Sequence, residues 1–439
     1  MSLRILCILF SLIVFVPSLN GLSIDYNRLG IKSSINDGVL YENNGERVLF
    51  VSGSYYEMGY QQGFLLKNQT QTNFNAFLHW INKQGYNYEE LASQWHVMKP
   101  YLPQCYIDEM QGIADGSDLS FENISVLNVG FYLVVNCGSF AAWGSATKDG
   151  KLYHARSHDF PINLEDPETG IYLVDTQVLI VRKPNGFFSS VSPSEAGFVS
   201  VSDGINENGI VVGMLSSWTD DEKLRGIGVG FRIRMVLDFA NTAEEAIKII
   251  TENTTLGYNF IVTDWKIPMG YAVETTSNLT YVGTWDNKIE STYPFWSIDC
   301  VVRRTNMFVN LDLAKTQRKN YNPSIFPLLS SLICTNKLSG TSVSSSSPWL
   351  HYKAISKGIE RQWGNLDLNT TMDVVRDIYL GKTSFRFSIL QFFGAYTTPY
   401  QWVICPETGD FVISYATRDK NAFENNIYFY NMYKLLEHY

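Results

Sequence analysis

Three residues of this sequence have types and spacing suited to covalent chemistry: Cys137, Arg156 and Asp159. An apolar stretch leads into Cys137, and the Asp149-Gly150 pair that follows is a strong signal for a hairpin between two strands. Such a hairpin would bring Arg156 and Asp159 back beside Cys137. A nearby positive charge favours the thiolate, which is the reactive form of cysteine. The pattern predicts a nucleophile, and the alternative is a small buried cysteine in a strand.

The hairpin sets a geometric condition on Arg156 and Asp159. Residues three apart in a strand point to opposite faces, so both side chains reach Cys137 only if the strand bends or bulges near Ser157-His158. The alternative is an exposed ion pair at a strand end.

Helices and strands must position these residues. Gly59 and Gly63 share one face of a predicted helix at 55–64, which suits close packing against a neighbouring element. Blocks of helices and blocks of strands, without regular βαβ alternation, predict an α+β fold with antiparallel sheets stacked between helical layers. The other predicted helices cover 74–81, 88–98, 105–114, 121–128, 230–240, 243–250, 351–361 and 372–380. The predicted strands cover 47–53, 172–181, 187–191, 197–201, 210–215, 258–263, 270–274, 279–282, 301–308, 401–405 and 410–415.

Composition limits the class of protein. The chain has 439 residues, 45% hydrophobic and 18% charged, with a net charge of -9 and no long basic run. This is a globular composition, and it argues against a nucleic-acid partner, which would need clustered Lys and Arg. The length allows one large layered fold or two to three domains.

The first residues predict targeting to the secretory pathway. One basic residue, Arg4, precedes an apolar run and a turn-rich end at Gly21, so 1–21 is interpreted as a signal peptide; the alternative is an uncleaved anchor. No later run is long enough to cross a bilayer, and the predicted location is secreted or lysosomal. Five Asn-x-Ser/Thr sites predict glycosylation, at Asn68, Asn123, Asn253, Asn278 and Asn369.

Five cysteines remain after removal of the signal peptide. An odd number in an oxidising compartment leaves at least one thiol unpaired or paired between chains. We expect Cys137 to be free, whereas Cys105, Cys300, Cys334 and Cys405 could form up to two disulfides. Their spacing fits no zinc pattern, so neither a metal nor another cofactor is predicted.

Several segments, in order, resemble the penicillin acyltransferase (acyl-coenzyme A:isopenicillin N acyltransferase) family of N-terminal nucleophile hydrolases, which is related to choloylglycine hydrolase and acid ceramidase. The matching segments are Gly53 to Gly59 with Gly63, Glu109 to Gly116, Asn136-Cys137 through Asp159, and Thr305-Asn306. The resemblance implies a four-layer αββα sandwich. It also implies self-cleavage between Asn136 and Cys137, so that a largely helical light chain or pro-region, 22–136, and a heavy chain, 137–439, form one catalytic unit.

A cysteine at a chain start carries its own α-amino group, whose pKa near 8 suits a general base. By resemblance, Asp159 would orient that amino group and Arg156 would lie beside the sulfur. Asn306 would stabilise an oxyanion, and its alternative is a solvated or turn-bonded asparagine. Asn206 would lend a polar contact, and its alternative is an ordinary hairpin turn.

The sequence also departs from the family pattern. Gly138 follows the nucleophile where relatives often have Thr, and Met307 follows Asn306 where relatives often have His. Acid ceramidase has a late arginine near its site, for which Arg318 is the best-placed candidate here.

The resemblance implies a self-processing cysteine hydrolase that cleaves a linear amide C–N bond. The substrate would be a small-molecule or lipid amide, such as an N-acyl lipid like ceramide or an N-acyl amino acid. Aromatic segments at 131–133 and 392–393 could line an acyl pocket, or could be ordinary core. The alternatives are an acyltransferase that uses the same thioester, although coenzyme A fits a secreted location poorly, and a secreted glycoprotein that kept this fold without turnover.

Overall fold

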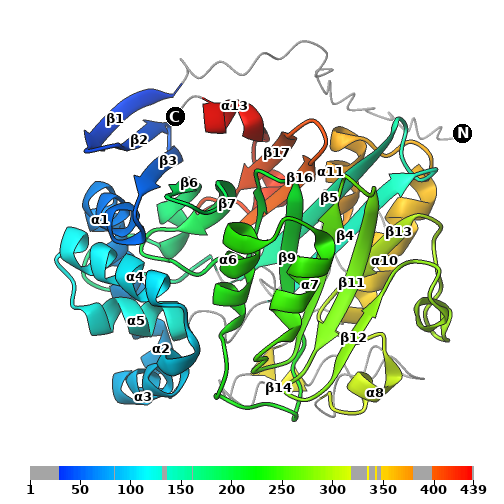
Figure 1. Ribbon diagram of the computed structural model, residues 1–439, viewed down its shortest axis with the longest axis horizontal. Helices are drawn as coiled ribbons and strands as arrows, with labels where there is room; N and C mark the ends of the chain where they lie inside the picture. Colours follow the sequence, from blue (N-terminus) through cyan, green and yellow to red (C-terminus); the bar gives the residue numbers. More distant parts are fainter. Residues whose placement is uncertain are drawn as a thin grey trace, which may run out of the picture.

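Two β-sheets lie face to face in the computed structural model, and helices cover their outer faces (Figure 1). The structure describes residues 29–83, 85–130, 136–160, 162–317, 334–335, 342–343, 348–378 and 398–437. The predicted signal peptide at 1–21, the aromatic segments at 131–133 and 392–393, and Arg318 lie outside these residues. The chain has the predicted α+β fold, a four-layer αββα sandwich.

The larger sheet contains ten strands, and its neighbours are antiparallel except for the parallel pair β3 and β6. In spatial order they are β1 (Gly30–Ile35), β2 (Gly38–Asn43), β3 (Glu46–Gly53), β6 (Gln177–Pro184), β7 (Ser190–Glu195), β8 (Asp203–Asn206), β9 (Ile210–Ser216), β10 (Tyr258–Asp264), β11 (Met269–Thr275) and β12 (Thr280–Gly283).

The smaller sheet is built around the hairpin that the Asp149-Gly150 pair predicts. Gly150 has φ +77°, a left-handed conformation that suits glycine. The strands of this sheet are, in order, β13 (Val301–Arg304), β4 (Asn136–Gly144), β5 (Gly150–Asp159), β16 (Tyr400–Cys405), β17 (Asp410–Tyr415) and β18 (Tyr428–Asn431). A separate short pair comprises β14 (Cys334–Thr335) and β15 (Ser342–Val343).

Helices form the two outer layers. Next to the larger sheet lie α6 (Val229–Phe239) and α7 (Ala243–Thr251), and beside them a group of α1 (Tyr55–Leu65), α2 (Lys67–Lys83), α3 (Tyr88–Met98), α4 (Gln104–Ser117) and α5 (Phe121–Gly130). On the smaller sheet lie α10 (Pro348–Gln362) and α11 (Leu368–Asp377). The short helices are α8 (Leu311–Ala314), α13 (Met432–Glu437), and the 3-10 turns η2 (Lys99–Tyr101), η4 (Leu173–Thr176), η5 (Lys288–Ser291) and η6 (Ala422–Glu424).

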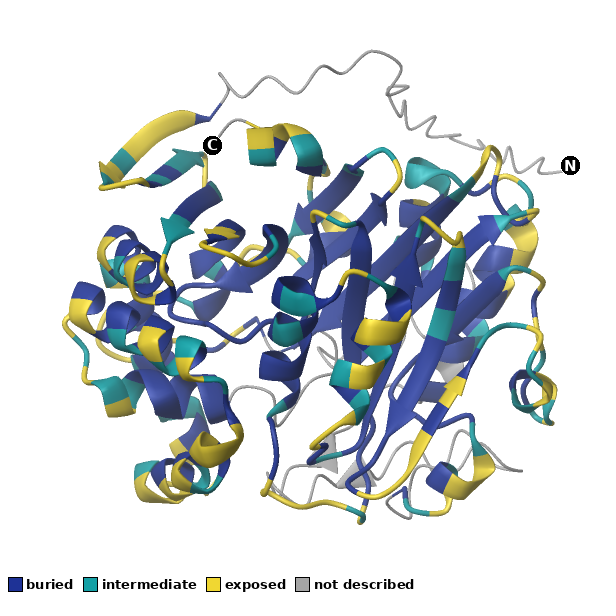
Figure 2. Ribbon diagram, in the orientation of Figure 1, coloured by how far each residue is buried: buried dark blue, intermediate teal, exposed yellow. Residues whose placement is uncertain are grey.

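Apolar side chains fill the space between the sheets. Phe50 and Val181 of the larger sheet pack in one cluster with Trp402 and Phe411 of the smaller one. Both sheets are mostly buried, whereas the exposed residues collect on helices and loops (Figure 2). Because the inner sheet faces exclude water, polar groups placed there must find partners within the protein.

The sequence allows up to two disulfides, and the structure shows none among the described cysteines. Cys105, Cys300 and Cys405 all carry free thiols, and Cys334 has no described side chain. Cys105 packs with the helices around α4, away from the smaller sheet. Cys300 precedes β13 and Cys405 ends β16, with β4 and β5 between these strands. Three strand spacings of about 4.8 Å exceed the Cα separation that a disulfide spans.

Three further sequence predictions concern glycosylation, membrane spans and metal binding. Asn68, Asn253 and Asn278 are exposed, whereas Asn123 and Asn369 are half-buried. None of the helices in the described ranges is long and apolar enough to cross a membrane. The same residues contain no group of three or more His, Cys, Asp or Glu side chains arranged to hold a metal ion. Glycosylation and the absence of a metal therefore stay predictions.

Candidate active site

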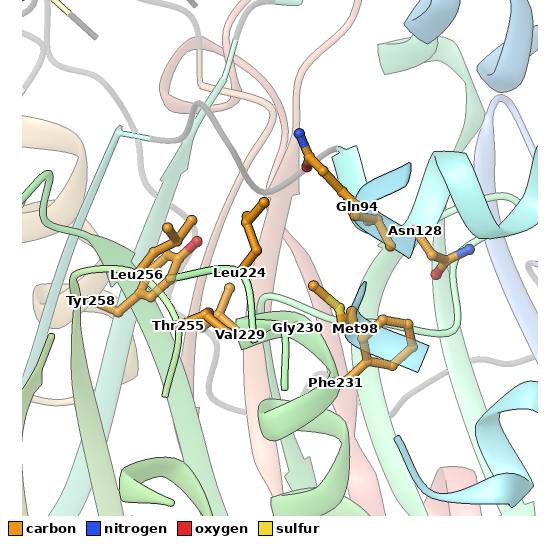
Figure 3. Close-up of a pocket in the computed structure, with 12 residues that line it drawn as sticks. Gln94, Met98, Asn128, Leu224, Val229, Gly230, Phe231, Thr255, Leu256 and Tyr258 are labelled. Atoms are coloured by element: carbon orange, nitrogen blue, oxygen red, sulfur yellow. The ribbon is translucent and has the colours of Figure 1, made fainter. Parts of the chain in front are cut away.

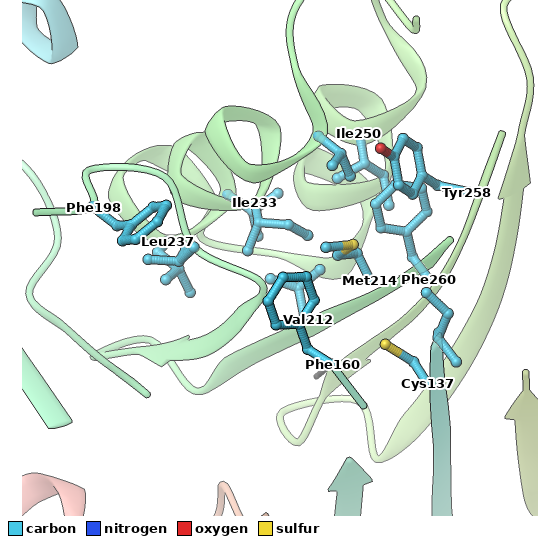
Figure 4. Packing of buried hydrophobic residues seen from close by; sticks show 14 of the residues in the cluster. Cys137, Phe160, Phe198, Val212, Met214, Ile233, Leu237, Ile250, Tyr258 and Phe260 are labelled. Carbon is cyan, nitrogen blue, oxygen red and sulfur yellow. The ribbon is translucent and has the colours of Figure 1, made fainter. Parts of the chain in front are cut away.

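Cys137 lies near the start of β4, with its side chain fully buried. The thiol packs in an apolar cluster with Phe160, Met214 and Phe260, next to Val212 (Figure 4). Burial alone fits a structural cysteine as well as a nucleophile, so its polar contacts decide between the two.

Arg156 contacts the sulfur of Cys137 as the hairpin predicts. The β4–β5 register pairs Cys137 with His158 and Ser139 with Arg156, so these side chains share one face of the hairpin. The Arg156 Nη2 donates to Cys137 Sγ at 2.9 Å. Its Nε donates to Asp203 Oδ2 at 3.3 Å, and Nη1 donates to the Ser157 carbonyl at 2.7 Å. The guanidinium is therefore fixed between the thiol and a carboxylate.

The pKa of the Cys137 thiol shows that Arg156 does not produce a thiolate by itself. Burial raises this pKa to about 12, and the charge of Asp159 adds to the rise. The charge and hydrogen bond of Arg156 lower the pKa, but desolvation outweighs them. The sequence predicts the direction of the arginine effect, not its size. Cys137 is therefore a neutral thiol at neutral pH, and it would need a base to act as a nucleophile.

Asp159 lies beside the predicted cleavage point without the bend that the sequence predicts. The β4–β5 ladder runs without a register shift from the Asn136–Asp159 pair, and its one irregularity is at Ala142/Gly144. The predicted bulge near Ser157-His158 is therefore wrong. The Asp159 Oδ1 accepts from Ser157 Oγ at 3.1 Å and from Thr398 Oγ1 at 2.9 Å. The carboxylate is fixed next to the backbone of the residue that precedes Cys137.

Asn306 holds the main-chain nitrogen of Cys137. The Cys137 N–H donates to Asn306 Oδ1 at 2.7 Å, and Asn306 Nδ2 donates to the Ser216 carbonyl oxygen at 2.8 Å. Asn259 fixes this loop, because its Nδ2 donates to the carbonyl oxygens of Thr305 and Met307, each at 2.7 Å. The contact that the structure shows is positioning of the Cys137 nitrogen, and the oxyanion role of Asn306 stays a prediction.

Asn206 makes contacts typical of a turn residue. Its Nδ2 donates to the Ala240 carbonyl at the end of α6 at 2.7 Å, and its Oδ1 accepts from the Ile210 N–H at 3.1 Å. These two hydrogen bonds close the β8–β9 turn and cap a helix, as the turn alternative predicts. Neither of them leads to Cys137.

The structure adds residues that the sequence did not indicate. Asp203 accepts from Arg156 and, at 2.7 Å, from the hydroxyl of Tyr400. Ser216 orients Asn306, and Thr398 orients Asp159. They lie far from Cys137 in the sequence, Asp203 and Ser216 in β8 and β9 and Thr398 just before β16. Of these residues, only Asp203 lies close in the sequence to a predicted site residue, which is Asn206.

An apolar pocket opens between the helices before Cys137 and the segments after it (Figure 3). Met98 and Val129 of α3 and α5 form one side, and Val229, Leu256 and Tyr258 form the other. Its volume is about 450 Å³ including the open mouth. Val229 and Tyr258 also belong to the large apolar cluster that contains Cys137.

The fold is a four-layer sandwich whose smaller sheet begins beside a buried cysteine with an arginine on its sulfur. The resemblance to the penicillin acyltransferase family is confirmed, because the family model for acyl-coenzyme A:6-aminopenicillanic acid acyl-transferase matches residues 145–342. This match includes Arg156, Asp159 and Asn306 and begins after Cys137. The description of this family concerns acyl transfer.

Curated relatives match about half of the chain. An uncharacterised protein of Archaeoglobus fulgidus is 28% identical over 47% of this chain and 39% of its own length. Proteins dcd1A and dcd1B of Dictyostelium discoideum are each 25% identical, over 52% and 50% of this chain and 59% and 48% of their own lengths. The chain thus spans roughly 40–60% of the curated relatives it matches.

Three solved structures are similar at low identity. The Caenorhabditis elegans ortholog of N-acylethanolamine-hydrolyzing acid amidase is 15% identical, with a TM-score of 0.38, over 67% of this chain and 100% of that one. A mutant of the conjugated bile acid hydrolase of Clostridium perfringens is 16% identical, with a TM-score of 0.37, over 67% of this chain and 96% of that one. Penicillin V acylase of Agrobacterium tumefaciens is 17% identical, with a TM-score of 0.37, over 68% of this chain and 87% of that one. TM-scores this low carry no inference about activity.

Proposed function

We propose that this protein is a self-processing N-terminal cysteine hydrolase that cleaves a linear amide C–N bond. The observation that carries the proposal is the set of contacts at Cys137, where Arg156 binds the sulfur and Asn306 binds the main-chain nitrogen. A structural cysteine has no need of either contact.

Cleavage between Asn136 and Cys137 would convert the nitrogen held by Asn306 into an α-amino group. Such a group has a pKa near 8, so near neutral pH an appreciable fraction is unprotonated and can accept the thiol proton. The thiolate that forms lies 2.9 Å from the Arg156 guanidinium, which stabilises its negative charge. Proton transfer to the adjacent amine would thus produce the thiolate, which Arg156 alone does not produce.

The reaction then follows the chemistry of a cysteine amidase. The thiolate attacks the substrate carbonyl carbon, the C–N bond breaks, and the amine leaves with a proton from the α-ammonium group of Cys137. The acyl group remains on sulfur as a thioester. Water adds to the thioester carbonyl, the C–S bond breaks, and the acid and the thiol are released.

The substrate that we propose is an N-acyl lipid, such as a ceramide, or an N-acyl amino acid. An acyl chain needs an apolar surface to bind to, and the pocket between Met98 and Tyr258 offers one (Figure 3). This pocket also lies between the segments that would become the light and heavy chains. We further propose a secreted or lysosomal glycoprotein, which the signal sequence and the five Asn-x-Ser/Thr sites support.

An acyltransferase is the second candidate, because the matching family is described by acyl transfer and both reactions share the thioester. The two differ only in what resolves the thioester. Adding a hydroxylamine acceptor to a reaction with an N-acyl amide distinguishes them. A transferase yields the hydroxamate as main product at low acceptor concentration, whereas a hydrolase yields mostly the free acid.

The first prediction tests self-cleavage by gel mobility and N-terminal sequencing. The wild-type protein should separate into two fragments, the larger of which begins Cys-Gly-Ser-Phe. Cys137→Ala should remain one chain without amidase activity, since it lacks the sulfur. Cys405→Ala, at another buried cysteine, is the matched control and should be cut normally. A wild-type protein that stays uncut and inactive would favour the alternative of a secreted glycoprotein without turnover.

A further inference from the structure

The backbone leaves the smaller sheet beside Cys137. The β13–β4 ladder ends where Arg304 lies opposite Ser139. Continued by two residues, the same register would set Asn306 opposite Cys137. Instead, the side-chain Oδ1 of Asn306 accepts from the Cys137 N–H, in place of a main-chain carbonyl. Residues 305–310, which we call the Asn306 loop, therefore determine where the partner of the Cys137 nitrogen lies.

Two neighbouring side chains of the larger sheet hold the Asn306 loop. Asn259 of β10 and Glu274 of β11 are directly opposite each other in the ladder, so they share one face of the sheet. Asn259 binds the near end of the loop through two of its main-chain carbonyl oxygens. Glu274 binds the far end, where its Oε1 accepts from the Val309 N–H at 2.8 Å and its Oε2 accepts from the Asn310 N–H at 3.0 Å.

Glu274 also connects the loop to the strand before it. Its Oε1 accepts from Arg304 Nε at 2.8 Å, and Arg304 Nη1 donates to Glu290 Oε2 at 2.8 Å. Glu290 in turn accepts from the hydroxyl of Tyr281 at 2.9 Å. One carboxylate thus binds the last residue of β13 and the end of the loop, so it fixes both sides of the segment that carries Asn306.

The polar pair has costs that a purely space-filling pair would not have. Asn259 and Glu274 are both fully buried. The Oδ1 of Asn259 has no hydrogen-bond partner among the described residues, and burial raises the pKa of Glu274 although the charge of Arg304 opposes the rise. Apolar residues of similar volume would fill the space between the sheets without either cost. What the polar pair adds is a fixed direction for the backbone of the loop.

We propose that Glu274 is a positioning residue of the site around Cys137, and that it acts through the Asn306 loop together with Asn259. The inference rests on the proposed amidase function. Glu274 would keep the Asn306 Oδ1 at the nitrogen of Cys137, first in the uncut chain and then at the α-amino group that cleavage would release. Its hydrogen bonds go to the loop and to Arg304 and not to Cys137 itself. Its loss should therefore slow the chemistry without weakening the binding of substrate.

The first measurement examines the loop and needs no enzyme activity. Amide hydrogen exchange is followed by mass spectrometry on full-length Cys137→Ala, with and without Glu274→Gln. Glutamine keeps the shape of the side chain but offers one acceptor oxygen where the carboxylate offers two, so the N–H of Val309 or Asn310 loses its partner. We expect exchange in 305–310 and at position 137 to become at least about tenfold faster.

The second measurement examines catalysis in the chain that retains Cys137. Glu274→Gln should lower kcat for an N-acyl amide and the rate of self-cleavage, each about tenfold, whereas KM should stay within about twofold of the wild-type value. Tyr281→Phe is the matched control, because it removes the hydrogen bond to Glu290 without touching the loop. It should leave kcat, KM and the exchange of the loop unchanged.

A further variant covers the case in which Glu274→Gln does not fold. Asn259→Ala releases the near end of the loop and is measured in the same way, with the same expected changes. The exchange of the Val309 and Asn310 amides in Cys137→Ala is a third readout that needs no second substitution. These amides should exchange as slowly as those of β13, because a buried carboxylate binds them.

Three results would overturn the proposal. The first is fast exchange of the Val309 and Asn310 amides in Cys137→Ala, or exchange that a folded variant of Glu274 or Asn259 leaves unchanged. The second is a folded, active variant whose kcat equals that of the wild type. The third is a loss of kcat in Tyr281→Phe as large as that in Glu274→Gln. Failure of the amidase proposal is distinguishable, since the wild-type chain would then be inactive while exchange in Cys137→Ala still responds to Glu274→Gln.

Discussion

Cys137 combines two opposing effects on its reactivity. Burial raises the pKa of its thiol to about 12, whereas the Arg156 guanidinium at 2.9 Å lowers that pKa. Desolvation is the larger effect, so a thiolate forms only when a base takes the proton within the same buried space. This favours a nucleophile that carries its own amine over one that depends on an arginine.

Asp203 gives the second prediction, because it holds Arg156 in place from the side away from the sulfur. Asp203→Asn keeps the shape of the side chain and removes the charge that pairs with the guanidinium. We expect kcat/KM for an N-acyl amide to fall about 10- to 100-fold near pH 7, which corresponds to roughly 1.4–2.8 kcal/mol.

The pH profile distinguishes positioning from a loss of folding. Burial raises the pKa of Asp203 to about 6, so the wild-type carboxyl is protonated near pH 5 and then resembles the asparagine variant. The difference between variant and wild type should therefore shrink as the pH falls. Tyr400→Phe, which removes the other hydrogen bond to Asp203, is the matched control and should have a smaller effect. A difference that stays constant between about pH 5 and pH 8 would contradict this role.

The sequence indicated Arg156 and Asn306 but not Asp203, Ser216 or Thr398. Arg156 is reached through a hairpin, which is a local feature that a turn signal reveals. Asp203 and Ser216 reach the site only because β8 and β9 lie in the sheet that faces the hairpin, and no local pattern encodes that packing. Asn206 ends β8, the strand that Asp203 begins. An asparagine is a residue type that active sites use, but the side chain of Asn206 closes the β8–β9 turn instead.

The close packing that Gly59 and Gly63 predict is confirmed, and the structure shows that the neighbouring element is α4. Gly59 and Gly63 lie on the face of α1 that meets α4, and a Cβ atom at either position would overlap the carbonyl oxygen of Glu109 or Ile113. Gly112 and Gly116 of α4 meet α1 in the same way. Glycines four residues apart on both helices let the two backbones come into direct contact.

Gly59→Ala is the third prediction and tests this contact. The added methyl group must push α1 from α4, because its nearest neighbour is rigid backbone and not a flexible side chain. We expect the free energy of unfolding to fall by about 1–3 kcal/mol, measured by urea denaturation. Gly30→Ala is the control, since a Cβ atom there meets nothing within 4 Å, and it should leave stability almost unchanged. Equal stability of both variants would argue against close helix packing.

Two predicted strands fail for a shared physical reason. The segment 197–201 has apolar, buried residues but no strand, because the N–H groups of Val199 and Ser200 donate to the side chain of Asn128. The predicted strand at 301–308 ends at Arg304, and beyond it Asn259 binds the main-chain carbonyls. In both segments the side chain of an asparagine that is distant in the sequence forms the backbone hydrogen bonds that a neighbouring strand would otherwise form. Residue periodicity predicts which positions are buried, but it does not predict which group forms hydrogen bonds with the backbone there.

The sandwich joins the segments on either side of the predicted cleavage point. The β3 strand, from the part before Cys137, pairs in parallel with β6 from the part after it. Buried polar contacts also cross this boundary: Arg234 donates to Glu109 at 3.1 Å, and Tyr106 donates to Asp238 at 3.0 Å. The described parts of 22–136 and 137–439 share one sheet and one core, so cleavage of the connecting backbone would leave both in one fold.

Buried titratable groups give the fourth prediction, which concerns the stability of the whole fold against pH. Burial and the neighbouring charge of Asp203 raise the pKa of Glu195 from 4.5 to about 8. The folded protein then holds a proton that the unfolded chain releases, so stability falls as the pH rises from about 4.5 to 8. His154 acts in the opposite sense, because burial and the charge of Arg156 lower its pKa from 6.5 to about 3. Its contribution is lost as the pH falls from about 6.5 to 3.

Together these two groups place the stability maximum on the mildly acidic side of neutrality. The free energy of unfolding, measured by urea denaturation, should stay nearly constant between about pH 4.5 and pH 6.5, where the two contributions cancel. It should then fall between about pH 6.5 and pH 8 by up to roughly 1.4 kcal/mol per pH unit for Glu195. Glu195→Gln keeps a neutral side chain at every pH and should flatten this decline while it leaves the acid side unchanged. A decline of equal slope in the variant would mean that Glu195 is already ionised in the folded protein and that other groups set the alkaline limit.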